Sequence, residues 1–239
     1  MHRERPSRVP GAIVWTSQPT GAEYRVLPDG CMDIIWCTDG KLTVAGPDTT
    51  AFMTSGSTGS QLTGIRFAPG FAPSLLRVPA HELRDRHEPL DAVMPARFAR
   101  RLADSLAASD APATVLESLA LSVDPPGEIG AVAEAARQGE SVTTIADALG
   151  LSPRHLHRRC LDAFGYGVKT LTRILRMNRA LDLVRAGTPY ADAAARAGYA
   201  DQSHLARDVK ALTGVPLGQL VSRAANRSTE FPSGSRIDA

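Results

Sequence analysis

The chain has 239 residues, 43% of them hydrophobic, and a formal net charge of +2. This length is enough for two modest domains that each bury a core. Three cysteines are too few for a disulfide scaffold, the N-terminus does not resemble a signal peptide, and no apolar run reaches the ~20 residues of a membrane span, so we expect a cytoplasmic protein.

Charge is distributed unevenly along the chain. Residues 129–227 hold 14 Lys and Arg against 8 Asp and Glu, whereas residues 1–128 hold 12 against 15. A basic half beside a mildly acidic half is typical of a nucleic-acid-binding domain joined to a domain with another role. Taken by itself, the uneven distribution of charge is explained equally well by chance.

The first 70 residues carry strand and turn signals. Short segments rich in β-branched and aromatic residues alternate with Pro-Asp-Gly, Thr-Asp-Gly and Gly-Pro-Asp turns. The expected strands are 12–15, 23–27, 32–36, 42–45 and 62–67. We predict a small β-barrel or sandwich of the cupin-like kind, followed by short helical pieces at 73–76 and 81–83, within an α+β chain of two domains.

Four residues of this domain are candidates for a ligand pocket: Tyr24, Asp33, Trp36 and Arg66. Aromatic side chains would form its floor, while Arg and Asp would fix a charged group. The alternative is that Asp33 and Arg66 face solvent or pair on the surface. No histidine occurs between His2 and His81, which argues against a metal-dependent cupin enzyme, and we predict no metal, cofactor or catalytic residue.

The cysteines allow one redox hypothesis. Cys31 follows a turn glycine, where an exposed, reactive thiol is conceivable, but a small buried hydrophobic side chain is the commoner role. Cys31 and Cys37 on one strand would be about 20 Å apart, beyond disulfide reach. Cys160 fits an apolar helical stripe and should be inert.

Two amphipathic helices are predicted at about 95–108 and 112–122. Their apolar stripes can pack on the barrel, form a homodimer interface across residues 95–122, or do both. Asp124-Pro125-Pro126-Gly127 follows, a stiff linker between an N-terminal sensor or dimerisation domain, 1–123, and a second domain, 128–224.

The second domain starts with a helix-turn-helix pattern. Ser141 is a good N-cap for a short apolar helix, Gly150 turns the chain, and Ser152-Pro153 starts the next helix. Leu156, Cys160 and Phe164 form its buried stripe. Arg154, His157 and Arg158 are left outside, at the end that suits insertion into the major groove of DNA.

The plan is repeated about 48 residues later. Gly198 turns the chain, and Asp201 caps a helix with the buried stripe Leu205, Val209 and Leu212. Gln202, Ser203, Arg207 and Lys210 are exposed in this prediction. A basic helix from Lys169 to Ala186 would connect the two units and hold them roughly 34 Å apart, in successive major grooves.

The repeated motifs resemble the DNA-binding domain of the AraC/XylS family of bacterial transcription regulators over residues 128–224. They are Ile145-Ala146, Gly150-Leu151-Ser152, His155-Leu156-x-Arg158, Gly165, Arg176-x-x-x-Ala180, Ala194-x-x-x-Gly198-Tyr199, Asp201-Gln202-Ser203-His204-Leu205-x-Arg207 and Gly214. In the N-terminal half, Leu27-Pro28-Asp29-Gly30-Cys31-x-Asp33, Gly46-Pro47-Asp48-Thr49 and Gly64-Ile65-Arg66-Phe67-x-Pro69-Gly70 more weakly resemble the sensor domain of one AraC-like subgroup over about 10–95.

The resemblance implies a sequence-specific regulator of transcription, either an activator or a repressor. Its partners would be promoter DNA, RNA polymerase and a small-molecule effector. Base-reading positions would be Arg154, His157, Arg158, Gln202, Ser203 and Arg207, and phosphate contacts would be Lys169, Arg173, Arg176 and Lys210.

Two alternatives stay open for the N-terminal domain. It could bind a partner protein in place of a ligand, or it could be a cupin-like enzyme with a DNA-binding domain appended, although the missing histidines argue against the second. The polar residues 225–239 are predicted to be a disordered tail.

Overall fold

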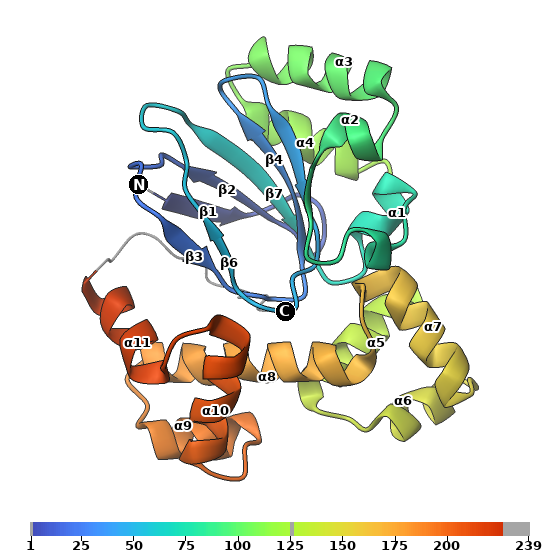
Figure 1. Cartoon of the computed structure of the whole chain (residues 1–239). Coiled ribbons are helices and arrows are strands. Elements are labelled where there is room, and N and C mark those ends of the chain that lie inside the picture. Colours follow the sequence, from blue (N-terminus) through green and yellow to red (C-terminus); the bar gives the residue numbers. More distant parts are fainter. Residues whose placement is uncertain (1, 125–126, 227–239) are drawn as a thin grey trace.

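The N-terminal domain is built on an antiparallel sheet of six strands in the order β1-β2-β7-β4-β5-β8. The computed structural model describes residues 2–124 and 127–226 (Figure 1). The strands are β1 (His2–Pro6), β2 (Ile13–Ser17), β4 (Met32–Cys37), β5 (Leu42–Ala45), β7 (Leu62–Phe67) and β8 (His87–Pro89). β3 (Tyr24–Val26) and β6 (Phe52–Thr54) pair separately, and we call them the β3–β6 ribbon.

The sheet and the ribbon do not close into a barrel within the described residues. The two-domain α+β prediction is therefore confirmed, while its barrel form is wrong and its sandwich form fits better. The five expected strands are present, but β1, β6 and β8 were not expected. β6 and β8 have three residues each, too few for a period-two pattern to be recognised.

Helices cover one face of the sheet (Figure 1). They are α1 (Ala72–Leu76), the 3-10 turn η1 (Ala80–Glu82), α2 (Leu90–Val93), α3 (Ala96–Ala107) and α4 (Pro112–Ala120). Side chains alternate along β4, so Met32, Ile34 and Trp36 point into the core under these helices and Asp33 points to the opposite face.

The predicted helical hairpin is α3 and α4, and it packs on the sheet. Leu106 and Leu116 are fully buried in the core of the N-terminal domain. Glu117, 1% exposed, accepts hydrogen bonds from Arg5 Nη1 at 2.8 Å and from the Arg8 backbone N–H at 3.0 Å. This ion pair fastens α4 to the first strand, so the hairpin's apolar stripes serve the domain's own core.

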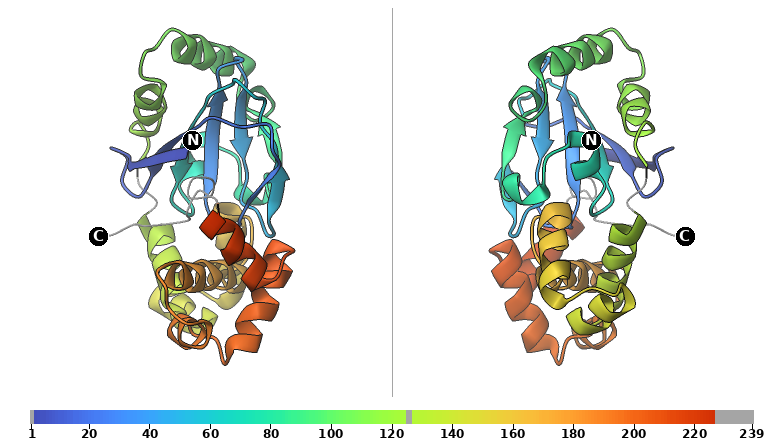
Figure 2. Two further views of the ribbon diagram at one scale, coloured as in Figure 1. Left: turned by 90° about the vertical axis from the view of Figure 1, so that its left-hand side faces the viewer. Right: turned by 90° about the vertical axis from the view of Figure 1, so that its right-hand side faces the viewer.

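In its described residues, the C-terminal domain has seven helices: α5 (Gly127–Gln138), α6 (Val142–Ala148), α7 (Pro153–Phe164), α8 (Val168–Arg185), α9 (Tyr190–Ala197), α10 (Gln202–Thr213) and α11 (Leu217–Asn226). α8 passes through the middle of the domain, and the α6–α7 and α9–α10 pairs lie at its two ends (Figures 1 and 2). Of the segments predicted as linker and tail, residues 125–126 and 227–239 lie outside the described residues. None of the described helices is both long and apolar enough to cross a bilayer.

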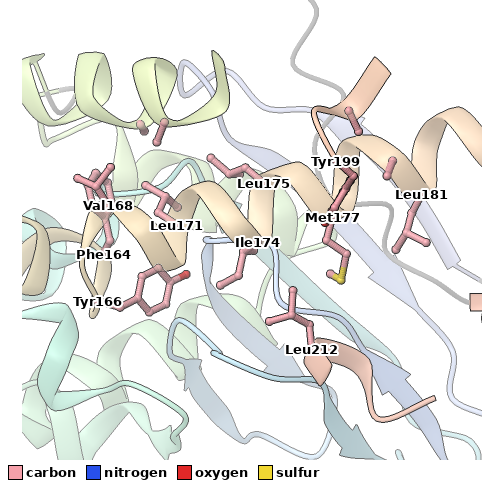
Figure 3. Packing of buried hydrophobic residues seen from close by; sticks show 14 of the residues in the cluster. Phe164, Tyr166, Val168, Leu171, Ile174, Leu175, Met177, Leu181, Tyr199 and Leu212 are labelled. Atoms are coloured by element: carbon pink, nitrogen blue, oxygen red, sulfur yellow. The ribbon is translucent and has the colours of Figure 1, made fainter. Parts of the chain in front are cut away.

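The core of this domain is organised around α8 (Figure 3). Leu171, Ile174 and Met177 are fully buried, and Phe164 and Leu212 reach the same cluster from the ends of α7 and α10. One central helix therefore fixes the relative position of both helix pairs. Burial of this continuous apolar surface is the main stabilising force of the domain.

Candidate functional site

The first helix-turn-helix unit is α6 and α7. Ser141 accepts a hydrogen bond from the Thr144 N–H and Ser152 accepts one from the His155 N–H, as the N-cap prediction required. Gly165 ends α7 in the left-handed conformation, with φ of 80°. The stripe of Leu156, Cys160 and Phe164 is buried, and burial raises the pKa of the Cys160 thiol to about 11.

The side chains that the sequence assigned to base reading on α7 lie on its solvent side. Arg154, His157 and Arg158 are all exposed. The His157 ring lies against the backbone of Gly167, because a Cβ added there would be 2.7 Å from its Nδ1. Arg159, by contrast, is held by Glu128 at 2.7 Å. The free face of α7 thus offers two guanidinium groups and one imidazole.

The second unit, α9 and α10, repeats this geometry. Asp201 accepts from the His204 N–H, and Gly198 and Gly214 close α9 and α10 with φ of 86° and 76°. Leu205 and Val209 are fully buried. The remaining predicted contacts of α10 are exposed, namely Gln202, Ser203, Arg207 and Lys210.

Asp208 is a residue of this site that sequence reasoning missed. It is 7% exposed and accepts a hydrogen bond from the Tyr199 hydroxyl at 2.9 Å. Arg173 and Arg176 of α8 both pair with its carboxylate, and Arg176 also lies 4.2 Å above the Tyr199 ring. Asp208 therefore braces α10 against α8. Its position next to Val209 and three residues after Leu205 was the available signal.

This arrangement bears on the predicted phosphate contacts. Arg173 and Arg176 both form ion pairs with Asp208 inside the protein, although 42% of the Arg173 side chain remains exposed. Lys169, at the start of α8, and Lys210 are exposed without such a brace. The 18 residues of α8 make it about 27 Å long, which sets the scale of the separation between the two units.

A cavity of about 300 Å³ lies between the six-stranded sheet and the β3–β6 ribbon. Tyr24, Asp33 and Arg66 line it, as predicted. Trp36 does not, and that prediction is wrong: it lies on the other face of β4, 6% exposed in the core. The indole that lines the cavity is that of Trp15, which lies over Gly64 and leaves no room there for a Cβ.

Arg66 is the central charge of the cavity and is only 4% exposed. Its Nε lies 3.3 Å from both Asp33 Oδ1 and Asp29 Oδ2, and its Nη1 lies 3.6 Å from Glu4 Oε1. Burial raises the pKa of Asp33 to about 6, against the lowering effect of Arg66. The alternative of a surface pair between Asp33 and Arg66 is wrong, because both lie inside the domain.

The structure contradicts the hypothesis of an exposed, reactive Cys31. Its side chain is buried, and burial, together with the charge of Asp29, raises the pKa of the thiol well above its ordinary value. The thiolate is the reactive species, so a raised pKa and burial both disfavour reaction at this thiol. Its backbone N–H donates a hydrogen bond to Asp29 Oδ1 at 2.9 Å, which stabilises the turn before it.

Segments that line the cavity also contact the C-terminal domain. Pro28 accepts a hydrogen bond from Asn178 Nδ2 of α8 at 2.8 Å. Arg25 donates to the Thr213 carbonyl at 2.5 Å, and the Ala51 N–H donates to the Leu212 carbonyl at 2.8 Å. One wall of the cavity is therefore tied to α8 and to the end of α10.

The first unit has its own contacts with the N-terminal domain. Arg84 donates to the Gly165 carbonyl at 3.2 Å, and His81 lies 3.3 Å from Asp162. Gly165 also lies close to the N-terminal domain. A Cβ at this position would be only 2.7 Å from Pro47, in addition to the strain of its left-handed backbone. Both helix pairs are thus held at the ends of α8 by one domain that carries a cavity.

Comparison with known proteins gives two family matches. Residues 145–223 match a family described as a helix-turn-helix domain, and residues 12–89 match a domain of unknown function, DUF6597. No curated protein matches the chain.

Solved structures are similar in fold. Wild-type ToxT from Vibrio cholerae bound to an unsaturated fatty acid shares 12% identity, with 91% of this chain and 96% of that chain covered and a TM-score of 0.50. An apo ToxT mutant from Vibrio cholerae shares 11%, covering 91% and 99%, with a TM-score of 0.49. The C-terminal domain of AraT, a response regulator from Geobacillus stearothermophilus, shares 22%, covering 45% and 91%, with a TM-score of 0.35. At these identities the likeness concerns the fold alone.

Proposed function

We propose that this chain is a transcription regulator of the AraC type, in which α7 and α10 read DNA under the control of a small molecule bound in the N-terminal domain. The observation that carries the proposal is the repeated unit. Two capped helices with buried apolar stripes and exposed polar faces sit at the two ends of one 18-residue helix. Two such helices can enter successive major grooves on one side of a duplex.

Direct contacts with base edges would come from the exposed faces of the two helices. On α7 these are Arg154, His157 and Arg158, and on α10 they are Gln202, Ser203 and Arg207. Arg can grip guanine through two hydrogen bonds and Gln can do the same with adenine. Lys169 and Lys210 would hold phosphates, joined by Arg173 and Arg176 to the extent that Asp208 leaves them free.

Replacing Arg207 by Ala tests base reading by α10. We expect a loss of about 1–3 kcal/mol for the preferred operator and relaxed specificity at one base position, because the guanidinium would read a base edge. The measurement is DNA affinity across a library in which each operator position is varied, after operators have been selected from genomic fragments.

Lys210→Ala is the matched control on the same helix. It should weaken binding to all sequences alike and lower the salt dependence of the affinity by about one ion. A uniform loss with Arg207→Ala would make Arg207 a phosphate contact as well.

The same geometry supports control by a ligand. The cavity wall that contains the β3–β6 ribbon and residues 27–31 is also the surface that contacts α8 and α10. A ligand that binds more tightly to one arrangement of this wall shifts the population toward the matching arrangement of the two reading helices. A thermal-shift screen separates a sensor from a module that binds only proteins, since a true ligand raises the melting temperature by mass action.

Replacing Arg25 by Ala tests the coupling without knowledge of the ligand. It removes the hydrogen bond from the ribbon to the Thr213 carbonyl at the end of α10. We expect faster amide exchange over residues 209–214 and a change in operator affinity of about 1 kcal/mol. Lys41→Ala, on an exposed turn of the same domain, is the control and should change neither quantity. Equal behaviour of the two variants would contradict coupling through the ribbon.

Homodimerisation through residues 95–122 and contact with RNA polymerase complete the proposal. α3 and α4 use most of their apolar surface inside the domain, and Leu121, 50% exposed, is the large apolar side chain left outside at the end of α4. Sedimentation velocity with and without operator DNA measures whether two chains assemble. We further propose that the domain is a sensor without catalytic activity of its own.

A further inference from the structure

We propose that the ligand of the cavity is a small organic cation, a protonated amine carried on a flat or apolar body. This inference rests on the proposed function, in which the cavity holds the effector, and it adds the chemical class. Three features of the walls carry it: their excess of carboxylates, a buried carboxylate oxygen that accepts no hydrogen bond, and aromatic rings.

The balance of charge inside the cavity is negative. Asp29, Asp33 and Asp48 line it, while Arg66 is the one Lys or Arg among the lining residues. The guanidinium of Arg66 already lies 3.3 Å from two of these carboxylates and 3.6 Å from Glu4. An incoming anion would therefore meet a cation that is already neutralised, together with the repulsion of the surrounding carboxylates. An incoming cation would instead be attracted by these carboxylates.

Polar atoms without a hydrogen bond mark where such a ligand would bind. Within the described part of the chain, Asp33 Oδ1 is buried and accepts no hydrogen bond, although Arg66 Nε lies 3.3 Å away. His87 Nε2 is also buried without a hydrogen bond and lies 3.5 Å from Asp48 Oδ2. Arg66 Nη1 also lacks a hydrogen bond. An ammonium group donates up to three hydrogen bonds, which suits Asp33 Oδ1, while a neighbouring ether or hydroxyl oxygen on the ligand would accept from Arg66 Nη1 and His87 Nε2.

The rest of the wall suits a flat cationic molecule. Trp15, Tyr24 and Phe52 present their rings, and Phe52 stacks on His87 with centroids 3.8 Å apart. Cations are attracted to the faces of such rings, most strongly where water is excluded. Apolar contact comes from Val26, Ile35 and Leu62. A volume of about 300 Å³ is at the small end of ligand cavities, which limits the ligand to a single ring with a short chain.

The ribbon contributes two aromatic rings to the cavity and also contacts the end of α10. Tyr24 and Phe52 line the cavity from β3 and β6, and Arg25 between them in the ribbon holds the end of α10. Phe52 is 36% exposed, so it lies at the edge of the cavity, where a ligand would draw it inward. A cation in the cavity would thus act on the end of α10 through the ribbon and Arg25.

The test compares three molecules of one shape and different charge: 2-phenylethylamine, 2-phenylethanol and 3-phenylpropanoate. Calorimetric titration of the full chain should rank them amine, alcohol, carboxylate, with the amine bound at least about tenfold tighter than the alcohol. Asp33→Asn should reduce this preference to about threefold or less, since it removes the charge that faces the ammonium. Asp48→Asn is a second variant that tests the same field if the first does not fold.

The outcomes separate two claims: that the ligand is a cation, and that a ligand in the cavity controls DNA binding. Tighter binding of the carboxylate, or no binding by the amine, overturns the cation class. If the carboxylate then changes operator affinity, ligand control still stands. Binding of the amine with its preference reduced in Asp33→Asn or Asp48→Asn supports the class, even if operator affinity stays the same, in which case ligand control of DNA binding is what fails.

Discussion

Replacing Arg66 by Met should cost about 3–5 kcal/mol of the free energy of unfolding near neutral pH. The substitution keeps an apolar chain of similar length but leaves three carboxylates, those of Asp29, Asp33 and Glu4, around a buried site with no cation. Removing one partner of a buried ion pair is far more costly than never having had the pair, because the remaining charge stays desolvated. The measurement is urea denaturation of the full chain.

The loss should depend on pH in a defined direction. Burial already raises the pKa of Asp33 to about 6, so in the wild-type protein the folded state binds more protons than the unfolded state between about pH 4 and 6. Stability from this group therefore falls as the pH rises through that window. Without Arg66 the pKa of Asp33 rises further, which extends the window upward. The deficit of Arg66→Met should shrink as the pH is lowered from about 7.5 to about 5.

Two controls isolate the charge from the packing. Arg66→Lys keeps the cation and should lose much less stability than Arg66→Met, with little extra dependence on pH. Arg66→Met combined with Asp33→Asn removes both charges and should recover part of the loss, because a neutral pair is left in the cavity. A deficit for Arg66→Met that is the same at both pH values would mean that packing, and not charge, accounts for it.

The C-terminal domain could be predicted almost completely from its sequence. Its signals are local: capping residues at Ser141, Ser152 and Asp201, turn glycines, and apolar stripes three or four residues apart. Because the pattern occurs twice, each unit supports the interpretation of the other. The contact that escaped prediction joins Asp208 to Arg173, 35 residues away, and to Arg176; the spacing of Asp208 from Leu205 marks it as buried but does not identify its partners on α8.

The cavity could be predicted in part, and the error is instructive. Asp33 and Arg66 do line the cavity, opposite each other on the neighbouring strands β4 and β7. Trp36 was misplaced although it is three residues from Asp33 on one strand, a spacing that puts the two side chains on opposite faces. The period of two was the signal that should have excluded it.

The contacts between the domains could not be predicted at all. Gly30 is next to Leu171 and Pro28 is next to Asn178, at sequence separations of more than 140 residues. Gly30 has φ of 85°, and a Cβ there would come within 3.0 Å of the Leu171 side chain, so the residue serves both a turn and a close approach. Its turn role can be seen in Pro-Asp-Gly, but the helix that it approaches cannot.

Replacing Leu205 by Ala should cost about 2–5 kcal/mol of the stability of the second unit. The variant should therefore lose binding at the half-site that this unit contacts. Leu205 is fully buried at the start of α10, within the core that also holds Leu212. Leu156 is its counterpart in α7, 1% exposed. The same truncation at the two positions should therefore affect different half-sites of the DNA. Leu205→Ala should lose protection of one half-site in a hydroxyl-radical footprint, and Leu156→Ala should lose protection of the other.

The two half-sites should be centred about one helical turn apart, roughly 34–36 Å along the duplex. α8 holds the two units at a fixed separation, and neither truncation touches it. Arg207→Ala serves as the control on α10, since it removes a contact without a cavity and should keep the footprint intact while changing the preferred base. If Leu205→Ala and Leu156→Ala weakened the same half-site, the two helices would not enter separate grooves, and the repeat would have to serve the fold instead of the reading of DNA.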